Sequence, residues 1–305
     1  MTWADAPRGA LGDASHYPTL SAISSALGAL GREGAGVLTI GASVEHRPLF
    51  ALALGPATRD TTLVVAGLHP LEWIGVAVAL GLARALSAPG AARRRVVIVA
   101  LANPDGYARV ERDQREGRRD LTRTNARGVD LNRNFPSYFA PRRARALPGP
   151  LGWGHGERPR SEPEVDAVCG LADDLTRSGA RLSRALSLHS AGRKVLYPYG
   201  GRLAAPRDAE AHRRAATALA RAFDDGYTVD QSSRWVPGAF APGMEIDHLH
   251  DAHGALALLV ECRGARPSHP RDALDPFRLF NPPDPEPVVR GLVPALARFV
   301  NGELP

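Results

Sequence analysis

Lysine and cysteine are almost absent from this 305-residue sequence. Lys194 is the only lysine, so arginine supplies nearly all of the positive charge behind a formal net charge of +6. Cys169 and Cys262 are the only cysteines, which excludes a small scaffold held together by several disulfides. The chain must therefore fold around an apolar core, and 44% of its residues are hydrophobic, which is enough for one.

Long apolar runs and an amino-terminal signal are missing as well. Residues 1–34 contain no basic segment followed by an apolar stretch and a small-residue cleavage site, as a secretory signal would. No apolar run is long enough to span a bilayer. We therefore expect a cytoplasmic protein with reduced thiols and no membrane partner. The sequence leaves the oligomeric state open.

Arginine occurs in short groups scattered along the chain, at 93–95, 118–119 and 142–145. We interpret these groups as solvated faces of a folded domain. A surface that attracts anions, including nucleic acid, is the alternative. Because no nucleic-acid-binding module accompanies the charges, we expect no nucleic-acid partner.

Apolar β patterns alternate with helical patterns over most of the chain. This alternation predicts an α/β fold with a mixed, largely parallel twisted sheet and helices on both faces. We expect residues 1–305 to form a single domain. The expected strands are two within 36–55 and one each at 61–66, 95–101, 185–188 and 255–260, and the expected helices are 18–32, 74–86, 162–177, 208–223 and 286–300.

Two local expectations go with this fold. Ser161 is the predicted N-cap of the helix at 162–177, with Glu164 completing a capping box. Residues 106–160 are rich in Arg, Gly and Pro and have little apolar period, so we expect long loops over one edge of the sheet. Loops of that length in a compact domain are usually functional or disordered.

Polar side chains follow the predicted strands directly. They are His69 to Glu72, Asn103 to Gly106, His189 with Ser190, and Glu261. In open α/β sheets, ligands bind outside the carboxyl ends of the strands, so we expect these side chains to meet. Two imidazoles and a carboxylate form one of the ligand sets of catalytic zinc, and a further glutamate can act as a general base.

Each of these signals is weak alone. One His-x-x-Glu is expected by chance, a lone His189 in an apolar strand is commonly a hydrogen-bonded core histidine, and Glu261 could pair with Arg263. Residues 247–253 (DHLHDAH) are also dense in ligand types, and His250 and His253 would share a helix face. We interpret that segment as a solvated helix that leads into the last strand.

The sequence resembles the zinc carboxypeptidase family of the carboxypeptidase A type, peptidase family M14, over about residues 16–300. The most specific motif is Gly-Val-Asp-Leu-Asn-Arg-Asn-Phe at 128–135. Two segments, 123–130 and 237–240, are also similar to bacterial murein-peptide amidases of that family. The other matching motifs lie at 43–48, 67–73, 103–107, 161–164, 187–190, 196–200 and 261.

The resemblance implies one Zn²⁺ per chain. His69, Glu72 and His189 match the metal ligands, and Glu261 matches the general base that activates water. Asp130 is expected to orient a ligand histidine.

The resemblance also implies how a substrate is held. Arg123 falls where the family has an arginine that stabilises the developing oxyanion, although Arg127 lies close by and could substitute. Asn132 and Arg133 match the pair that binds the terminal carboxylate of a peptide. By its position fifteen residues before Glu261, Ile246 matches the residue that lines the pocket for the terminal side chain.

An apolar Ile246 predicts a preference for aliphatic or aromatic terminal residues. If the register is shifted by one residue, Glu245 or Asp247 would face the pocket and select basic or diaminopimelate ends. Some positions depart from digestive members of the family: Leu71 replaces an arginine and Ala191 a tyrosine. A mobile active-site tyrosine cannot be placed, since its register falls near 239–240.

The resemblance therefore predicts a zinc-dependent metallocarboxypeptidase that acts on a peptide or peptide-like substrate with a free terminal carboxylate. The alternatives are a murein-peptide amidase, a small-molecule deacylase of the aspartoacylase pattern, and a zinc-binding module without enzymatic activity. The last is disfavoured because both the ligands and the general base are present.

Overall fold

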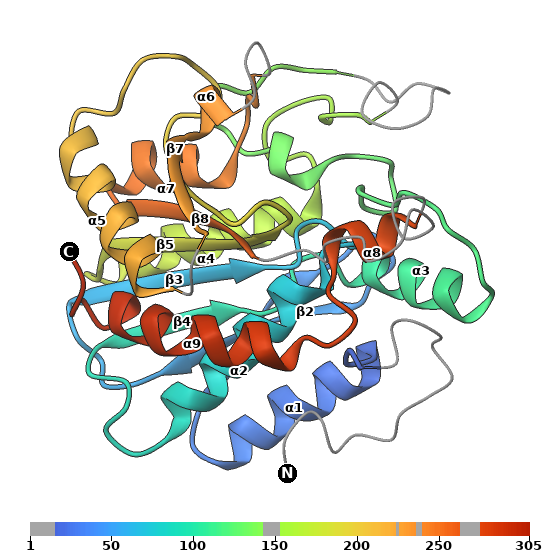
Figure 1. Ribbon diagram of the computed structural model, residues 1–305, viewed down its shortest axis with the longest axis horizontal. Helices are drawn as coiled ribbons and strands as arrows, with labels where there is room; N and C mark the ends of the chain where they lie inside the picture. Colours follow the sequence, from blue (N-terminus) through green and yellow to red (C-terminus); the bar gives the residue numbers. More distant parts are fainter. Residues whose placement is uncertain (1–15, 143–152, 224–225, 236–239, 263–274) are drawn as a thin grey trace.

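One sheet of eight strands runs through the part of the chain that the computed structural model describes, residues 16–142, 153–223, 226–235, 240–262 and 275–305 (Figure 1). Its strand order is β1-β2-β4-β3-β5-β8-β6-β7. The strands are β1 (Gly36–Ala42), β2 (Pro48–Leu54), β3 (Asp60–Ala66), β4 (Arg95–Val99), β5 (Arg181–Ser190), β6 (Lys194–Tyr197), β7 (Thr228–Gln231) and β8 (Leu256–Cys262).

The centre of the sheet is parallel. Strands β4, β3, β5 and β8 run in one direction, whereas β2 joins β4 and β6 joins β8 in antiparallel pairs. The chain therefore has the mixed, largely parallel sheet that the alternating pattern predicts. Strands β6 and β7 were not predicted, because four residues each are too few for a clear period.

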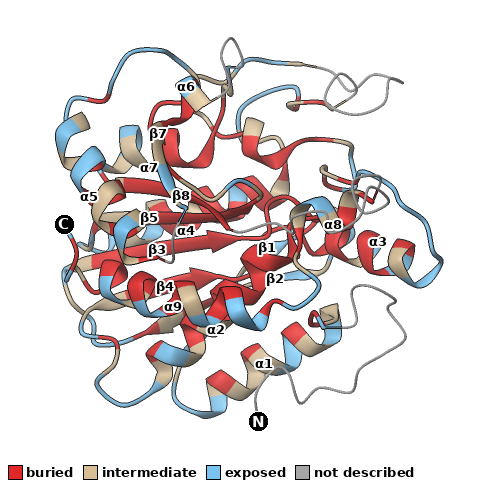
Figure 2. Ribbon diagram, in the orientation of Figure 1, coloured by how far each residue is buried: buried red, intermediate tan, exposed pale blue. Residues whose placement is uncertain are grey.

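Helices cover both faces of the sheet, which confirms the predicted architecture. Apolar residues of α1, α2, α5 and α9 pack with one face, and those of α4 and α7 pack with the other. In Figure 2 the sheet and the inner sides of these helices are buried. The helices are α1 (Leu20–Arg32), α2 (Trp73–Ser87), α3 (Pro104–Arg115), α4 (Pro163–Arg177), α5 (Ala209–Ala222), α6 (Ser232–Trp235), α7 (Glu245–His253), α8 (Pro276–Phe280), α9 (Glu286–Val300) and a 3-10 turn, η3 (Leu131–Arg133). Among the described residues, no helix combines the length and apolarity needed to cross a membrane.

Helix α3 corrects the prediction that residues 106–160 are all loop. Asn103 caps the helix by accepting a hydrogen bond from the Gly106 amide, and Pro104 occupies the first turn. Tyr107 and Val110 are buried on its inner side. The apolar stripe is so short that charged neighbours obscure it in the sequence.

The start of α4 corrects a second prediction. The N-cap is Glu162, without a side-chain capping bond, and not Ser161. Ser161 Oγ accepts a hydrogen bond from Asn134 and donates one to Glu162. Glu164 accepts bonds from the Val44 amide and from Asn125, so tertiary partners replace the capping box.

Asn281 fixes the loop between β3 and α2 to the carboxyl-terminal part of the chain. Its Oδ1 accepts a hydrogen bond from the Ile74 amide at the start of α2 (2.9 Å), and its Nδ2 donates to the carbonyl oxygens of Leu71 (2.7 Å) and Phe277 (2.9 Å). The side chain is 1% exposed. Without this side chain the Ile74 amide and the Leu71 carbonyl oxygen would be left unpaired, whereas the Phe277 carbonyl oxygen would keep its bond from the Asn281 amide.

We expect Asn281→Ala to lower the free energy of unfolding by about 2 kcal/mol or more, since each of the two unpaired buried groups costs about 1–3 kcal/mol. Urea unfolding measures the loss. Asn301→Ala is the matched control, because Asn301 also bonds two backbone groups, Arg93 N and Ala91 O, at another place. Hydrogen exchange of the Ile74 amide should accelerate only in Asn281→Ala. A loss below about 1 kcal/mol would contradict this clamp.

Candidate metal centre

The carboxyl ends of three parallel strands bring the predicted chemical groups together. His69 lies three residues beyond β3, and His189 pairs in register with Glu261 where β5 and β8 run side by side. Helix α2 begins directly after Glu72 and packs on β5. At Gly75 a Cβ atom would lie 2.8 Å from the Leu188 carbonyl oxygen, so only glycine permits this close approach.

His69, Glu72 and His189 form a tight, buried group. Nδ1 of His69 lies 2.8 Å from Glu72 Oε1, Nδ1 of His189 lies 2.8 Å from Glu72 Oε2, and the two Nδ1 atoms are 3.0 Å apart. Each residue is at most 3% exposed. The carboxylate thus offers one oxygen to each ring, and the two ring nitrogens face each other.

This donor set fits zinc. Zinc takes imidazole nitrogen and carboxylate oxygen at roughly 2.0–2.2 Å, and ligand atoms about 3 Å apart can share one such ion. Nε2 of His69 lies 3.0 Å from Asp130 Oδ1, so the proton of that ring belongs on Nε2 and the lone pair on Nδ1. The three residues would hold the ion, and Asp130 orients one of them, as predicted from the resemblance.

The electrostatics of the group favour a charged Glu72 carboxylate. Burial alone would raise the pKa of Glu72, but the neighbouring His69 and His189 outweigh it and lower that pKa. Burial lowers the pKa of His189. Burial would likewise raise the pKa of Asp130, but Arg123 and His69 bring it well below its usual range.

Arg123 lies at the edge of the group. Its Nε donates to Asp130 Oδ2 (2.9 Å), its Nη1 lies 3.3 Å from Glu72 Oε1, and its guanidinium lies over the ring of Trp153. Arg127 is instead 54% exposed and directed to Glu162 at 3.9 Å. The structure therefore places Arg123, and not Arg127, beside the metal ligands.

Asn132 and Arg133 lie in the 3-10 turn η3, next to His189. Asn132 Nδ2 is 3.4 Å from His189 Nε2, too long to decide the tautomer of that ring, and Asn132 Oδ1 accepts the Glu245 amide. The partly buried Arg133 donates to the Asn132 carbonyl oxygen, and among the described residues no carboxylate lies within ion-pair distance of it. Its charge is thus available to an anion from outside.

Glu261 is 7% exposed, and its Oε2 has no hydrogen-bond partner among the described residues. Burial and the nearby Glu72 carboxylate raise the pKa of Glu261 well above its usual range, against the effect of Arg123. The predicted pairing partner Arg263 lies outside the described residues. A buried carboxyl oxygen without a partner, beside the candidate ligands, is poised to accept a proton.

Ile246 lies in the first turn of α7 with its side chain in the core, at 1% exposure. Its two acidic neighbours are buried too, which the interpretation of α7 as a solvated helix did not anticipate. Glu245 accepts a hydrogen bond from Ser187, and Asp247 accepts the amides of Gly200 and Gly201. Burial raises the pKa of Glu245 to about 8 and that of Asp247 to about 7. The role of Ile246 in a substrate pocket stays a prediction.

The segment 247–253 does not form a metal site of its own. The rings of His248 and His253 meet edge to face at 5.7 Å, while His250 turns towards Asp208 and His212. That second group of ligand types is unsuited to a metal, because His212 Nε2 accepts the Ala257 amide and its Nδ1 therefore carries the proton.

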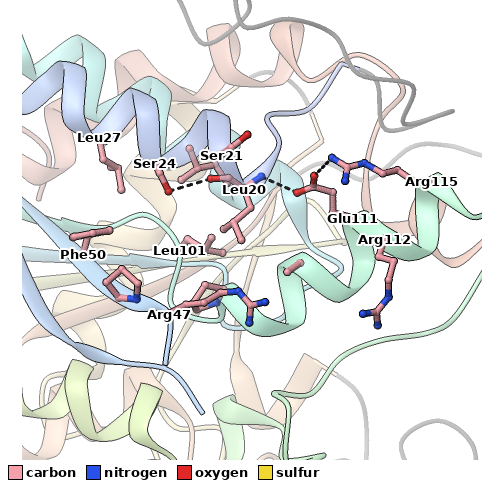
Figure 3. A pocket seen from close by; sticks show the side chains of 14 residues that line it. Leu20, Ser21, Ser24, Leu27, Arg47, Phe50, Leu101, Glu111, Arg112 and Arg115 are labelled. Carbon is pink, nitrogen blue, oxygen red and sulfur yellow. Dashed lines mark hydrogen bonds and ion pairs between the residues drawn. The ribbon is translucent and has the colours of Figure 1, made fainter. Parts of the chain in front are cut away.

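A separate cavity of about 590 Å³ lies between α1, α3 and β2 (Figure 3). Leucines of α1, Phe50 and Leu101 line its apolar side, and Arg112 and Arg115 of α3 lie at the other side. None of the candidate metal ligands lines it. The segment 237–240, with its similarity to amidases, lies outside the described residues except for Phe240, which is 51% exposed.

Comparisons with known proteins match most of this chain. The family model for zinc carboxypeptidases matches residues 33–274. Mouse carboxypeptidase A2 is 28% identical over 267 residues, which cover 81% of this chain and 62% of that protein. The chain thus spans about three fifths of that relative's length.

Two solved structures share the fold. Bovine thrombin-activatable fibrinolysis inhibitor, solved in complex with tick carboxypeptidase inhibitor, superposes with a TM-score of 0.77 at 22% identity, covering 94% of this chain and 97% of that one. Murein-tripeptide amidase MpaA from Escherichia coli O157 gives a TM-score of 0.57 at 23% identity, covering 89% and 95%.

We expect His189→Ala to lose zinc, since one of three protein ligands disappears. Its zinc affinity should fall by more than the roughly 10–100-fold that removal of an outer-shell partner costs. Metal analysis after dialysis provides the measurement. His250→Ala, in the Asp208 group, is the matched control and should keep one zinc per chain. Full occupancy in His189→Ala, or zinc loss in the control, would place the metal elsewhere.

Proposed function

The chain belongs to the zinc carboxypeptidase family, and on that premise we propose that it is a metallocarboxypeptidase that hydrolyses the last peptide bond before a free carboxylate. The observation that carries the proposal is Arg133. A guanidinium without a described carboxylate partner, one residue from Asn132 at the candidate metal centre, provides a site for a terminal carboxylate. Arginine and carboxylate pair through two parallel hydrogen bonds, which position a substrate as well as bind it.

The residues around the metal would divide the reaction among them. A bound zinc ion supplies a Lewis acid that makes water more acidic and polarises the substrate carbonyl. Glu261 takes a proton from the attacking water at Oε2 and delivers it to the leaving amine as the carbon–nitrogen bond breaks. Arg123 donates hydrogen bonds to the oxygen on which negative charge develops. Arg133 and Asn132 hold the terminal carboxylate, so that the scissile bond lies at the metal.

We expect Glu261→Gln to reduce kcat by roughly 10²–10⁴-fold, because the amide keeps the shape of the side chain and loses its basicity. Zinc content and the Kd for an uncleaved substrate analogue should remain near the wild-type values. Turnover of N-acylated dipeptides measures the loss. A rate within about tenfold of the wild type would remove Glu261 from proton transfer.

We expect Arg133→Ala to raise KM about tenfold or more for substrates with a free terminal carboxylate, because a charge-assisted hydrogen bond contributes about 1.5–3 kcal/mol. Amidated substrates cannot form this pair, so Arg133→Ala and the wild type should cleave them at the same slow rate. Arg127→Ala removes an exposed arginine from the same loop and serves as the control. Equal penalties on free and amidated substrates would exclude the exopeptidase function.

A murein-peptide amidase is the second candidate. The segment 123–130 resembles such enzymes, and the buried acids Glu245 and Asp247 flank the position predicted to face the terminal side chain. A substrate panel that varies the terminal residue and includes muropeptides separates the two candidates. Preference for Phe or Leu supports the register that places Ile246 in the pocket, whereas preference for diaminopimelate supports the amidase.

A further inference from the structure

A second open cavity lies at the end of the sheet opposite to the candidate metal centre. Its volume is about 620 Å³. It is formed where β3 and β5 begin and just before β4, so it collects the amino-terminal ends of the parallel strands. We call it the arginine cavity, and it is lined by Thr58, Arg59, Asp60, Arg93, Arg94 and Arg181.

Positive charge exceeds negative charge in the arginine cavity. Asp60 is the only acid among the described residues that line it, and Arg181 donates to both oxygens of that carboxylate (2.7 and 2.8 Å). Arg93 is 72% exposed and lies 3.4 Å from Glu303. Within the described part of the chain, Arg59 and Arg94 have no ion-pair partner. Two guanidinium groups therefore line the cavity with their charge uncompensated.

The influence of these charges extends to their neighbours. The hydrogen bonds from Arg181, with the charges of Arg181, Arg94 and Arg59, lower the pKa of Asp60 against the opposing effect of burial. Burial and the charge of Arg94 lower the pKa of Arg184 to about 10. The guanidinium of Arg184 lies over the ring of Phe299. The charge of Arg94 therefore acts on two neighbouring groups, Asp60 and Arg184.

The cavity is held in shape by contacts that need no ligand. Thr58 Oγ1 accepts the Arg95 amide (3.0 Å) and donates to the Asp60 carbonyl oxygen (2.8 Å), and the Arg181 amide donates to the Arg59 carbonyl oxygen (2.7 Å). Arg94 packs on the backbone of Gly302. A Cβ atom at position 302 would lie 2.5 Å from the Cζ atom of Arg94. The backbone around the cavity and Arg94 are therefore held in place before a ligand binds, which reduces part of the entropy cost of binding, while Arg59 is exposed.

We propose that the arginine cavity binds a phosphate group, with Arg59 and Arg94 as its direct ligands. A phosphate dianion balances the two uncompensated charges, and a planar guanidinium matches its oxygens bidentately. A single carboxylate would balance only one of them. The phosphate group could belong to inorganic phosphate or to a small phosphorylated metabolite. For a metabolite, the rim of the cavity must also accommodate the rest of the molecule.

Isothermal titration calorimetry of the zinc-loaded protein, at constant ionic strength, tests the proposal with two probes, inorganic phosphate and glucose 6-phosphate. We expect one site per chain. Tighter binding of the sugar phosphate would identify a metabolite, and tighter binding of phosphate the free ion. The double substitution Arg59→Ala and Arg94→Ala should weaken the tighter probe by at least about tenfold.

The matched control removes the same charge at Arg207 and Arg290, which are exposed and without an ion-pair partner in the described parts of the chain. It should change the Kd by less than about twofold, since screened charges far from a site contribute little. Thermal unfolding without phosphate separates binding from folding. The Tm of the Arg59 and Arg94 variant should equal or exceed that of the wild type, because like-charge repulsion is relieved.

Several results would overturn the proposal. If phosphate binds at the metal centre instead, the variant that lacks Arg59 and Arg94 will still bind it. Equal weakening in the control would mean that only diffuse positive charge is involved. A short DNA duplex that binds through Arg59 and Arg94, while both phosphate probes fail to bind, would assign the cavity to nucleic acid instead.

Discussion

The contact between the Glu72 carboxylate and the two imidazole rings constrains most of this molecule. A buried carboxylate is costly unless each oxygen has a partner, and here His69 takes one oxygen and His189 the other. That contact requires α2 to start against β5, which Gly75 permits, and requires the preceding loop to be held. Asn281 holds it from 210 residues away.

Residues that orient other side chains have their hydrogen bonds satisfied within the protein. Residues that are available to a substrate do not. Asp130 is satisfied by His69 and Arg123, so it can orient but has little left to offer a ligand. Glu261 has an unpartnered oxygen, and Arg133 has a charge without a described carboxylate partner. A substrate with an amide bond and a terminal carboxylate would satisfy both, which is why the incomplete groups carry the proposed chemistry.

The same parallel strands generate two sites of different character. Because β3, β4 and β5 run in one direction, all their carboxyl ends meet at one end of the sheet and all their amino ends at the other. The candidate metal ligands, two imidazoles and a carboxylate, gather at the first end, and the arginine cavity lies at the second. Arg93 and Arg94, from a group interpreted as a solvated face, line a cavity there.

The sequence by itself predicted the central strands of the sheet, the helices α1, α2, α4, α5 and α9 and the candidate ligand set, because apolar period and strand ends are local signals. His69 and Glu72 are three residues apart and follow a strand directly. Only the tertiary structure decided that Ser161 bonds Asn134 instead of capping α4, that α3 interrupts a predicted loop, and that the acids of α7 are buried. These contacts depend on partners that are distant in the chain, and such partners leave no local pattern in the sequence.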